Sequence, residues 1–154
     1  MWGENRKVLA LDVGERRIGV AVSDPTGTLA HPLKALARGS REEDVTAIAA
    51  LVAAESAELV VVGRPLSLDG SEGPQARRIA RYAEALAARL PVPVVLWDER
   101  YTTAEAEEIL HLSRSEKQRR HARTAGDLDA IAAAVILQSY LDSRRDSHIA
   151  SREE

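Results

Sequence analysis

The stretch VLALDVGERRIGVAVSD, residues 8–24, decides the fold, because two apolar, valine-rich runs flank a short polar segment that starts at Gly14. Runs of this length, rich in β-branched residues and separated by a glycine-containing turn, predict two strands joined as a hairpin. Asp12 stands at the end of the first run, where an apolar side chain is expected. Burying a carboxylate without a partner is costly, so either Arg16 or Arg17 pairs with it or it helps to hold a cation.

The bulk composition indicates one soluble, globular domain. The chain has 154 residues, of which 45% are hydrophobic and 29% charged, and it is large enough to enclose a proper core. No apolar run is long enough to cross a bilayer and no secretion leader is evident, so we expect no membrane partner and a cytoplasmic location. The absence of cysteine excludes disulfides and thiolate metal sites.

The charge balance argues against a generally basic nucleic-acid binder. The formal net charge is −3 at pH 7, so contact with a polyanion needs a local basic patch. Two tryptophans, three tyrosines and no phenylalanine offer few platforms on which single-stranded bases could stack. If a nucleic acid binds, we expect its backbone and shape to be recognised more than its bases.

The rest of the chain predicts alternating strands and helices. Pro32 cannot donate to a strand ladder, which makes the third strand, residues 28–37, an edge strand, and Ser40 and Glu43 form a capping box that opens a helix. We expect further strands at 58–63 and 92–97, helices at 74–90, 102–112 and 127–141, and a frayed polar tail at 144–154. This order predicts an α/β fold in a single domain spanning 1–154, with a mixed five-stranded sheet (three antiparallel strands, then parallel ones) flanked by helices.

Carboxylates from distant parts of the chain are predicted to meet at one edge of this sheet. Asp12 and the pair Asp98-Glu99 fall at carboxyl ends of strands, where the sites of open sheets gather. Asp129 lies near the start of the last helix, on the shoulder of an apolar stripe. The predicted stripe consists of Leu128, Ile131, Ala132, Val135 and Ile136. An aspartate in a first helical turn is also an ordinary capping residue, the role expected of Asp127.

Clustered carboxylates need a compensating charge. Two like charges about 4 Å apart repel by roughly 4 kcal/mol at an effective dielectric of about 20, so a proton or a cation must share the site. Oxygen ligands without histidine or cysteine suit Mg²⁺ or Mn²⁺. Two such ions roughly 4 Å apart can promote phosphodiester hydrolysis. None of the four histidines falls at a strand end beside these acids, so all four are interpreted as surface or packing residues.

Four ordered segments resemble the YqgF/RuvX family. They are LALDVGERRIGVAVSD, VVGRPLSLDGSEGPQA, WDERYTTAEAE and DLDAIAAAVILQSYL, and the resemblance extends from about residue 7 to residue 142. It implies an RNase H-like fold related to Holliday junction resolvases, and a nuclease that processes the 5′ end of pre-16S ribosomal RNA. It also implies that Asp12, Asp98 and Asp129 are the catalytic, metal-binding acids.

Which member of the pair Asp98-Glu99 faces the metal ions stays open. Side chains alternate along a strand, so only one of the two can point inward. Asp98 shares parity with Val94 and Leu96 and is preferred, with Glu99 as the alternative, although Trp97 could equally mark the inward face.

Basic side chains border the predicted acidic site. Arg16, Arg64 and Arg100 belong to the segments that carry the resemblance, and we expect them to bind phosphate together with Arg17. For Arg77 and Arg78, a solvated position on the surface is as good an explanation as phosphate binding. A late basic segment, predicted to be a loop that contacts nucleic-acid backbone or is simply solvated, contributes Arg114, Lys117, Arg119, Arg120 and Arg123.

The leading hypothesis is a metal-dependent nuclease that acts on structured RNA. The first alternative is a Holliday junction resolvase that acts on branched DNA, which we expect to be a homodimer, whereas an RNA-processing nuclease could work alone. The second alternative is a nucleic-acid-binding module without catalysis, which loss of a carboxylate would indicate, and all three acids are present. A sugar-kinase or actin-like lobe is disfavoured because those chains need two copies of the hairpin motif and this chain has one.

Overall fold

The computed structural model describes residues 6–66, 69–99 and 124–153, with side chains described as far as residue 144. Its strands are β1 (Val8–Val13), β2 (Arg17–Ser23), β3 (Ala30–Ala37), β4 (Leu59–Arg64) and β5 (Val94–Asp98). Its helices in these ranges are α1 (Arg41–Glu55), α2 (Pro74–Arg89) and α5 (Ala125–Glu153). The helix predicted at 102–112 and most of the late basic segment lie outside the described residues.

The strands form one mixed sheet in the order β3-β2-β1-β4-β5. The first three strands pair antiparallel, whereas β4 is parallel to both β1 and β5. Pro32 lies on the edge strand β3 opposite Ala21, beside a register shift after Val20, as expected of a residue that has no N–H to donate. The predicted α/β fold, with three antiparallel strands followed by parallel ones, is confirmed.

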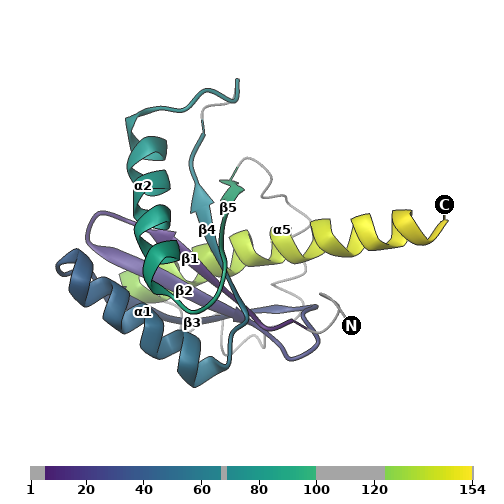
Figure 1. Ribbon diagram of the computed structural model, residues 1–154, viewed down its shortest axis with the longest axis horizontal. Helices are drawn as coiled ribbons and strands as arrows, with labels where there is room; N and C mark the ends of the chain where they lie inside the picture. The colour runs from purple at the N-terminus through teal and green to yellow at the C-terminus, as the bar shows by residue number, and fades with distance from the viewer. Residues whose placement is uncertain (1–5, 67–68, 100–123, 154) are drawn as a thin grey trace.

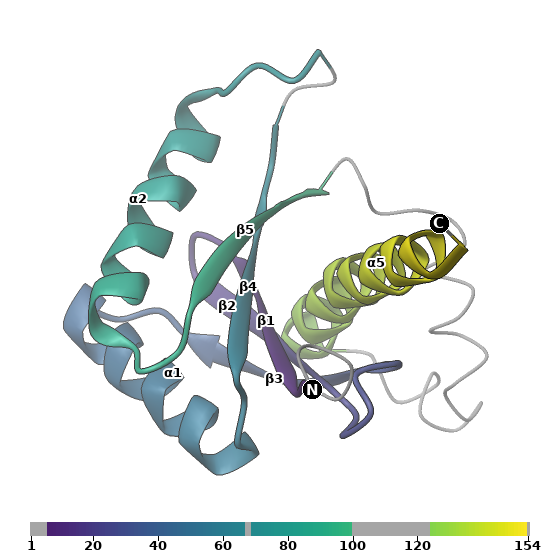
Figure 2. The same cartoon turned by 45° about the vertical axis from the view of Figure 1, so that its right-hand side comes forward.

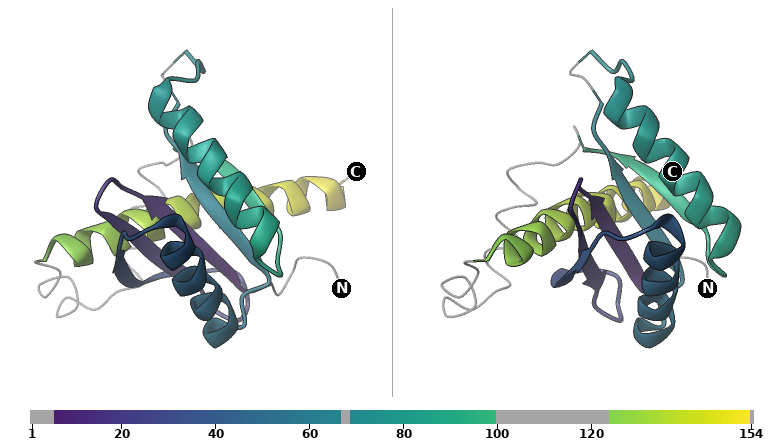
Figure 3. Two further views of the ribbon diagram at one scale, coloured as in Figure 1. Left: turned by 60° about the vertical axis from the view of Figure 1, so that its left-hand side comes forward. Right: turned by 90° about the vertical axis from the view of Figure 1, so that its left-hand side faces the viewer.

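Helices cover both faces of the sheet. α1 and α2 lie on one face and α5 crosses the other (Figures 1 and 2), an arrangement also seen when α1 and α2 are turned toward the viewer (Figure 3). Leu9 and Leu11 of β1 face the α1–α2 side, whereas Val8 and Ala10 face α5. Because side chains alternate along a strand, the same parity places Asp12 on the α5 face.

Local sequence signals account for the starts of α1 and α2. The Ser40 hydroxyl accepts a hydrogen bond from the Glu43 amide at 3.1 Å, and the Glu43 carboxylate accepts one from the Ser40 amide at 3.0 Å, so the predicted capping box is confirmed. Pro74 begins α2, where its missing N–H would have had no helical partner. None of the described helices is long and apolar enough to cross a membrane.

α5 departs from its prediction in length and at Leu128, whereas Ile131, Val135 and Ile136 of the predicted stripe pack against the sheet. It runs from Ala125 to Glu153, through the segment predicted to fray, because no glycine or proline after Gly126 interrupts it. Leu128, predicted to belong to the apolar stripe, is 58% exposed. The side chains that α5 buries against the sheet include Ala130, Ala133, Ala134, Leu137 and Leu141. Small residues near the start of this stripe allow the helix to approach the strands closely.

The closest approach is at Gly19 of β2. A Cβ atom at this position would collide with the backbone carbonyl of Asp129 in α5. A glycine is therefore required for the helix to cross the strand at this depth.

Replacing Gly19 with Ala should lower the free energy of unfolding by roughly 1–3 kcal/mol, because the added methyl group must displace helix backbone. Urea unfolding followed by circular dichroism measures the loss. Gly73→Ala is the matched control, since a Cβ at Gly73 meets no atom within 4 Å. Equal stability of the two variants would contradict the close contact.

Candidate active site

Asp12 lies on the α5 face between two glycines. It pairs in register with Gly19 on β2. On its other side, Leu11 pairs with Val62 of β4, and the next residue of that strand is Gly63. Because neither flanking residue has a side chain, the space on both sides of the Asp12 carboxylate is left to groups from other elements.

Asp129 approaches Asp12 over Gly19. The backbone of Asp129 lies directly against Gly19, which brings the helix residue to the strand pair that carries Asp12. Burial raises the pKa of Asp12, and the nearby charge of Asp129 raises it further. The structure therefore brings these two predicted site residues within electrostatic reach of each other.

Glu99 approaches Asp12 over Gly63. A Cβ atom on Gly63 would lie 3.0 Å from Oε1 of Glu99 and 2.7 Å from Cδ1 of Ile136 in α5. The Glu99 side chain is therefore on the α5 side of the sheet. Burial raises the pKa of Glu99 to about 7, and the charges of Asp12 and Asp98 contribute to the rise.

This geometry favours Glu99 over Asp98 as the acid beside Asp12. Val94 and Leu96 pack against the core on the α1–α2 side, whereas Trp97 packs against the core on the α5 side. Strand parity therefore directs Asp98 away from the other acids, and Glu99 is the member of the pair beside Asp12. The sequence pattern could not identify the side of β5 that faces α5, because both faces of this strand pack against apolar cores. The roles of both residues stay predictions.

Arg17 binds Asp129 and not Asp12. Nε of Arg17 donates to Oδ2 of Asp129 at 2.5 Å, with 43% and 31% of the two side chains exposed. A pair this exposed contributes at most about 1 kcal/mol. Within the described ranges no cation forms an ion pair with Asp12. The pairing of Asp12 with Arg16 or Arg17 that the sequence allowed is thus not formed there.

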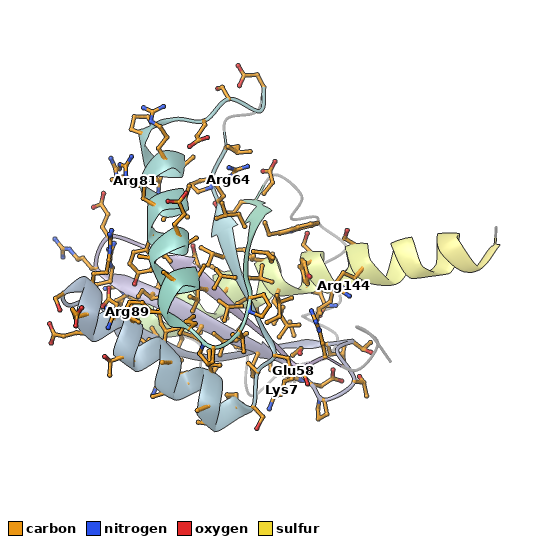
Figure 4. The ribbon with its side chains drawn as sticks, viewed as in Figure 1. Lys7, Glu58, Arg64, Arg81, Arg89 and Arg144 are labelled. Atoms are coloured by element: carbon orange, nitrogen blue, oxygen red, sulfur yellow. The ribbon has the colours of Figure 1, made fainter. Side chains whose placement is uncertain are left out.

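The other predicted phosphate-binding residues are only partly visible. Arg16 is exposed in the turn between β1 and β2. Arg64 ends β4 (Figure 4), and its buried Nε has no hydrogen-bond partner among the described residues, which is rare for a buried polar atom. The residues that lie outside the described ranges are Arg100, Arg114, Lys117, Arg119, Arg120 and Arg123.

The donor set of Asp12, Glu99 and Asp129 fits a divalent cation in its chemistry. All donors are carboxylate oxygens, which suit Mg²⁺ or Mn²⁺, and burial together with the neighbouring acids raises the pKa of Asp12 and of Glu99, so a bound cation would favour their ionised forms. The arrangement is not yet that of a chelate, since the described residues contain no group of three acids or histidines close enough to hold one ion. A cation would compete with Arg17 for Asp129.

The two glycines are functional positions that the sequence interpretation missed. Gly19 and Gly63 admit Asp129 and Glu99 to the space beside Asp12. The available signal was a single glycine inside each of two otherwise apolar, β-branched strands. Such a glycine indicates the close approach of another group.

Comparison with other sequences relates nearly the whole chain to one family. Residues 6–143 match the model of the family described as RuvX: Holliday junction resolvase. A protein of Syntrophus aciditrophicus is 48% identical over 145 residues, 94% of each chain. A protein of Caldanaerobacter subterraneus is 43% identical over 145 residues, 92% of this chain and 99% of the other. Both relatives are named as candidate pre-16S rRNA nucleases.

Comparison with solved structures concerns the fold. RuvC of T. thermophilus, solved with a Holliday junction substrate, superposes with a TM-score of 0.54 at 18% identity and covers 91% of this chain and 96% of its own. The yeast mitochondrial Holliday junction resolvase gives 0.57 at 11% identity over 92% and 79%. The RNase H-like fold that the resemblance implied is confirmed.

In metal-free buffer, stability should fall as the pH rises from about 4.5 to about 7. The pKa of Glu99 is raised from 4.5 to about 7 in the folded protein. Between these values the folded state keeps a proton that the unfolded chain has lost, so raising the pH favours unfolding. Thermal unfolding in EDTA between pH 5 and pH 8 measures the trend.

The Glu99→Gln variant should lose most of this pH-dependent decrease in stability. The control Glu84→Gln, which replaces an exposed glutamate of α2, should keep it. A fall of the same size in the Glu99→Gln variant would contradict the proposed origin.

Proposed function

The chain belongs to the family described as RuvX: Holliday junction resolvase, and we propose that it is a nuclease that hydrolyses phosphodiester bonds at Asp12, Glu99 and Asp129. The observation that carries this proposal is the meeting of three acids from separate elements around two glycines, with the pKa values of Asp12 and Glu99 raised. Perturbed acids of this kind concentrate at catalytic sites. Asp98 is the alternative second acid.

We propose precursor 16S ribosomal RNA as the substrate, cleaved at its 5′ end. The support is the name shared by relatives that are 48% and 43% identical over more than nine-tenths of this chain. The resolvases of known structure are 18% and 11% identical and support the fold alone. Branched DNA is therefore the second candidate substrate, and a cytoplasmic location is proposed with the first.

The three acids would hold one or two Mg²⁺ or Mn²⁺ ions, which activate water and stabilise the leaving oxygen when bound. Asp12 lies between Asp129 and Glu99, so its carboxylate could bind the same cation as either neighbour. Arg17, beside Asp129, can donate to a phosphate oxygen and hold the substrate against the acids. Arg16 and Arg64 border the same end of the sheet and supply further positive charge there.

Asp12→Asn should lower Mn²⁺-dependent cleavage at least about 100-fold, because loss of a mere outer partner of a metal ligand already costs 10–100-fold. Binding should be nearly unchanged. The assay uses labelled pre-16S rRNA, single-stranded RNA, duplex and a four-way DNA junction, with Glu84→Gln as the control. Cleavage of the junction alone would favour the resolvase alternative, and cleavage retained by Asp12→Asn would assign the activity to other residues.

Mn²⁺ at about ten times its Kd should raise the Tm by roughly 3–6 °C, since binding to the folded state alone stabilises it by about 1.4 kcal/mol. Differential scanning fluorimetry measures the shift. The variant Asp12→Asn/Glu99→Gln/Asp129→Asn should show none. An equal shift in that variant would place the ion elsewhere.

A further inference from the structure

A pocket lined by four arginines lies on the face of the sheet opposite the acidic cluster, the name used here for Asp12, Glu99 and Asp129. It has a volume of about 360 Å³ and opens between the β1–β2 turn, the start of α1 and the helix α2. Its basic side chains, called here the arginine pocket, are Arg38, Arg41, Arg78 and Arg81. Glu15 is the one acid among the described lining side chains. So many positive charges in a small space indicate a site for an anion.

Arg38 is held in place by a buried acid. Asp44 is 3% exposed and accepts hydrogen bonds from the Tyr82 hydroxyl and the Gly39 amide, each at 2.9 Å. Nε of Arg38 lies 3.6 Å from the same carboxylate, and Nη1 of Arg38 donates to the Gly14 carbonyl at 2.9 Å. This network orients one guanidinium of the pocket before any ligand arrives.

Tyr82 positions a second guanidinium. The guanidinium carbons of Arg38 and Arg41 lie 5.1 Å and 5.8 Å from the centroid of the Tyr82 ring, within the range of cation–π attraction. The tyrosine itself is 3% exposed, so its ring offers no open face on which a base could stack. The pocket is therefore suited to phosphate groups more than to nucleobases.

Arg78 and Arg81 complete the pocket from α2. They are three residues apart and lie on neighbouring turns of one helix face, and both are exposed. Figure 4 shows Arg81 on the side of α2 turned away from β4. Neither residue forms an ion pair with a described side chain, so both guanidinium groups can bind an incoming anion.

We propose that the arginine pocket binds the phosphate backbone of the nucleic acid at a distance from the bond that is cut. This inference rests on the proposed nuclease function. Val13 and Gly14 line the pocket and directly follow Asp12 in the chain, so the pocket and the acids share one end of β1. A strand that passes around the β1–β2 turn meets both sites. Guanidinium groups match phosphate oxygens in charge and in geometry.

The test compares two double variants of equal charge. Arg78→Gln/Arg81→Gln removes two cations from the pocket. Arg77→Gln/Arg89→Gln removes two exposed cations of the same helix. Their hydrogen-bond acceptors, the Glu72 carbonyl and the Glu42 carboxylate, belong to residues that do not line the pocket. Fluorescence anisotropy with a labelled RNA hairpin, in EDTA and over a series of NaCl concentrations, measures binding by the full chain.

The pocket variant should bind the hairpin about tenfold more weakly, and its slope of log affinity against log salt should be smaller by about two, one unit per phosphate contact. The control should keep the wild-type slope. If the two variants lost hairpin affinity equally, the change in net charge alone would explain the loss, and the proposal would be overturned.

A second arm distinguishes a small phosphate ligand from a backbone. Inorganic phosphate and AMP are added at millimolar concentration in thermal unfolding. Stabilisation of the wild type but not of the pocket variant, with hairpin binding unchanged between them, would assign the pocket to a small phosphate compound and overturn the backbone proposal.

Cleavage assays separate this proposal from the nuclease itself. The pocket variant should raise KM more than it lowers kcat, whereas Asp12→Asn should lose kcat and keep hairpin affinity. If the pocket variant binds as the wild type does while Asp12→Asn loses cleavage, the pocket proposal fails and the nuclease stands. If hairpin binding depends on the pocket but Asp12 is dispensable for cleavage, the assignment of catalysis to Asp12 fails and the pocket proposal stands.

Discussion

The contact between the backbone of α5 and Gly19 of β2 is the constraint on which the acidic cluster depends. A helix normally stands off from a sheet by the depth of the side chains between them. Here the side chain is missing from the strand and alanines line much of the buried side of the helix. The helix therefore lies low enough for Asp129 to act on the pKa of Asp12.

Gly63 does on β4 what Gly19 does on β2, and together they explain how acids from two other elements reach Asp12. Each glycine leaves a space beside Asp12 that a carboxylate from another element enters. Burial and mutual repulsion then oppose ionisation, so the charge of the cluster favours cation binding. The ion pair of Arg17 with Asp129 places one positive charge beside the cluster.

Residues 8–24 and the order of elements were sufficient to predict the sheet, its strand directions and the position of Asp12, because apolar periodicity and turn residues are local signals. The facing of β5 could not be predicted in this way, and that of α5 was predicted only in part, since Leu128 is exposed. Both faces of β5 pack against apolar cores, so parity alone did not choose between Asp98 and Glu99. Alanine-rich α5 has no sharp apolar stripe, and its rotation is set by a glycine more than a hundred residues earlier in the chain. The arginine pocket combines side chains from separate elements, and no local pattern marks it.

The alternation of side chains along β1 has a consequence for insertions and deletions. Asp12 faces one side of the sheet while Leu11 and Val13 face the other. Neighbouring residues of this strand therefore point toward the acidic cluster and toward the side of the arginine pocket in turn. Removing or adding one residue before Asp12, with the strand pairing kept, would reverse every side chain that follows. The carboxylate would then enter the apolar core under α1 and α2, and leucine and valine would replace it beside Asp129. Insertions or deletions of a single residue in this strand are therefore incompatible with either site.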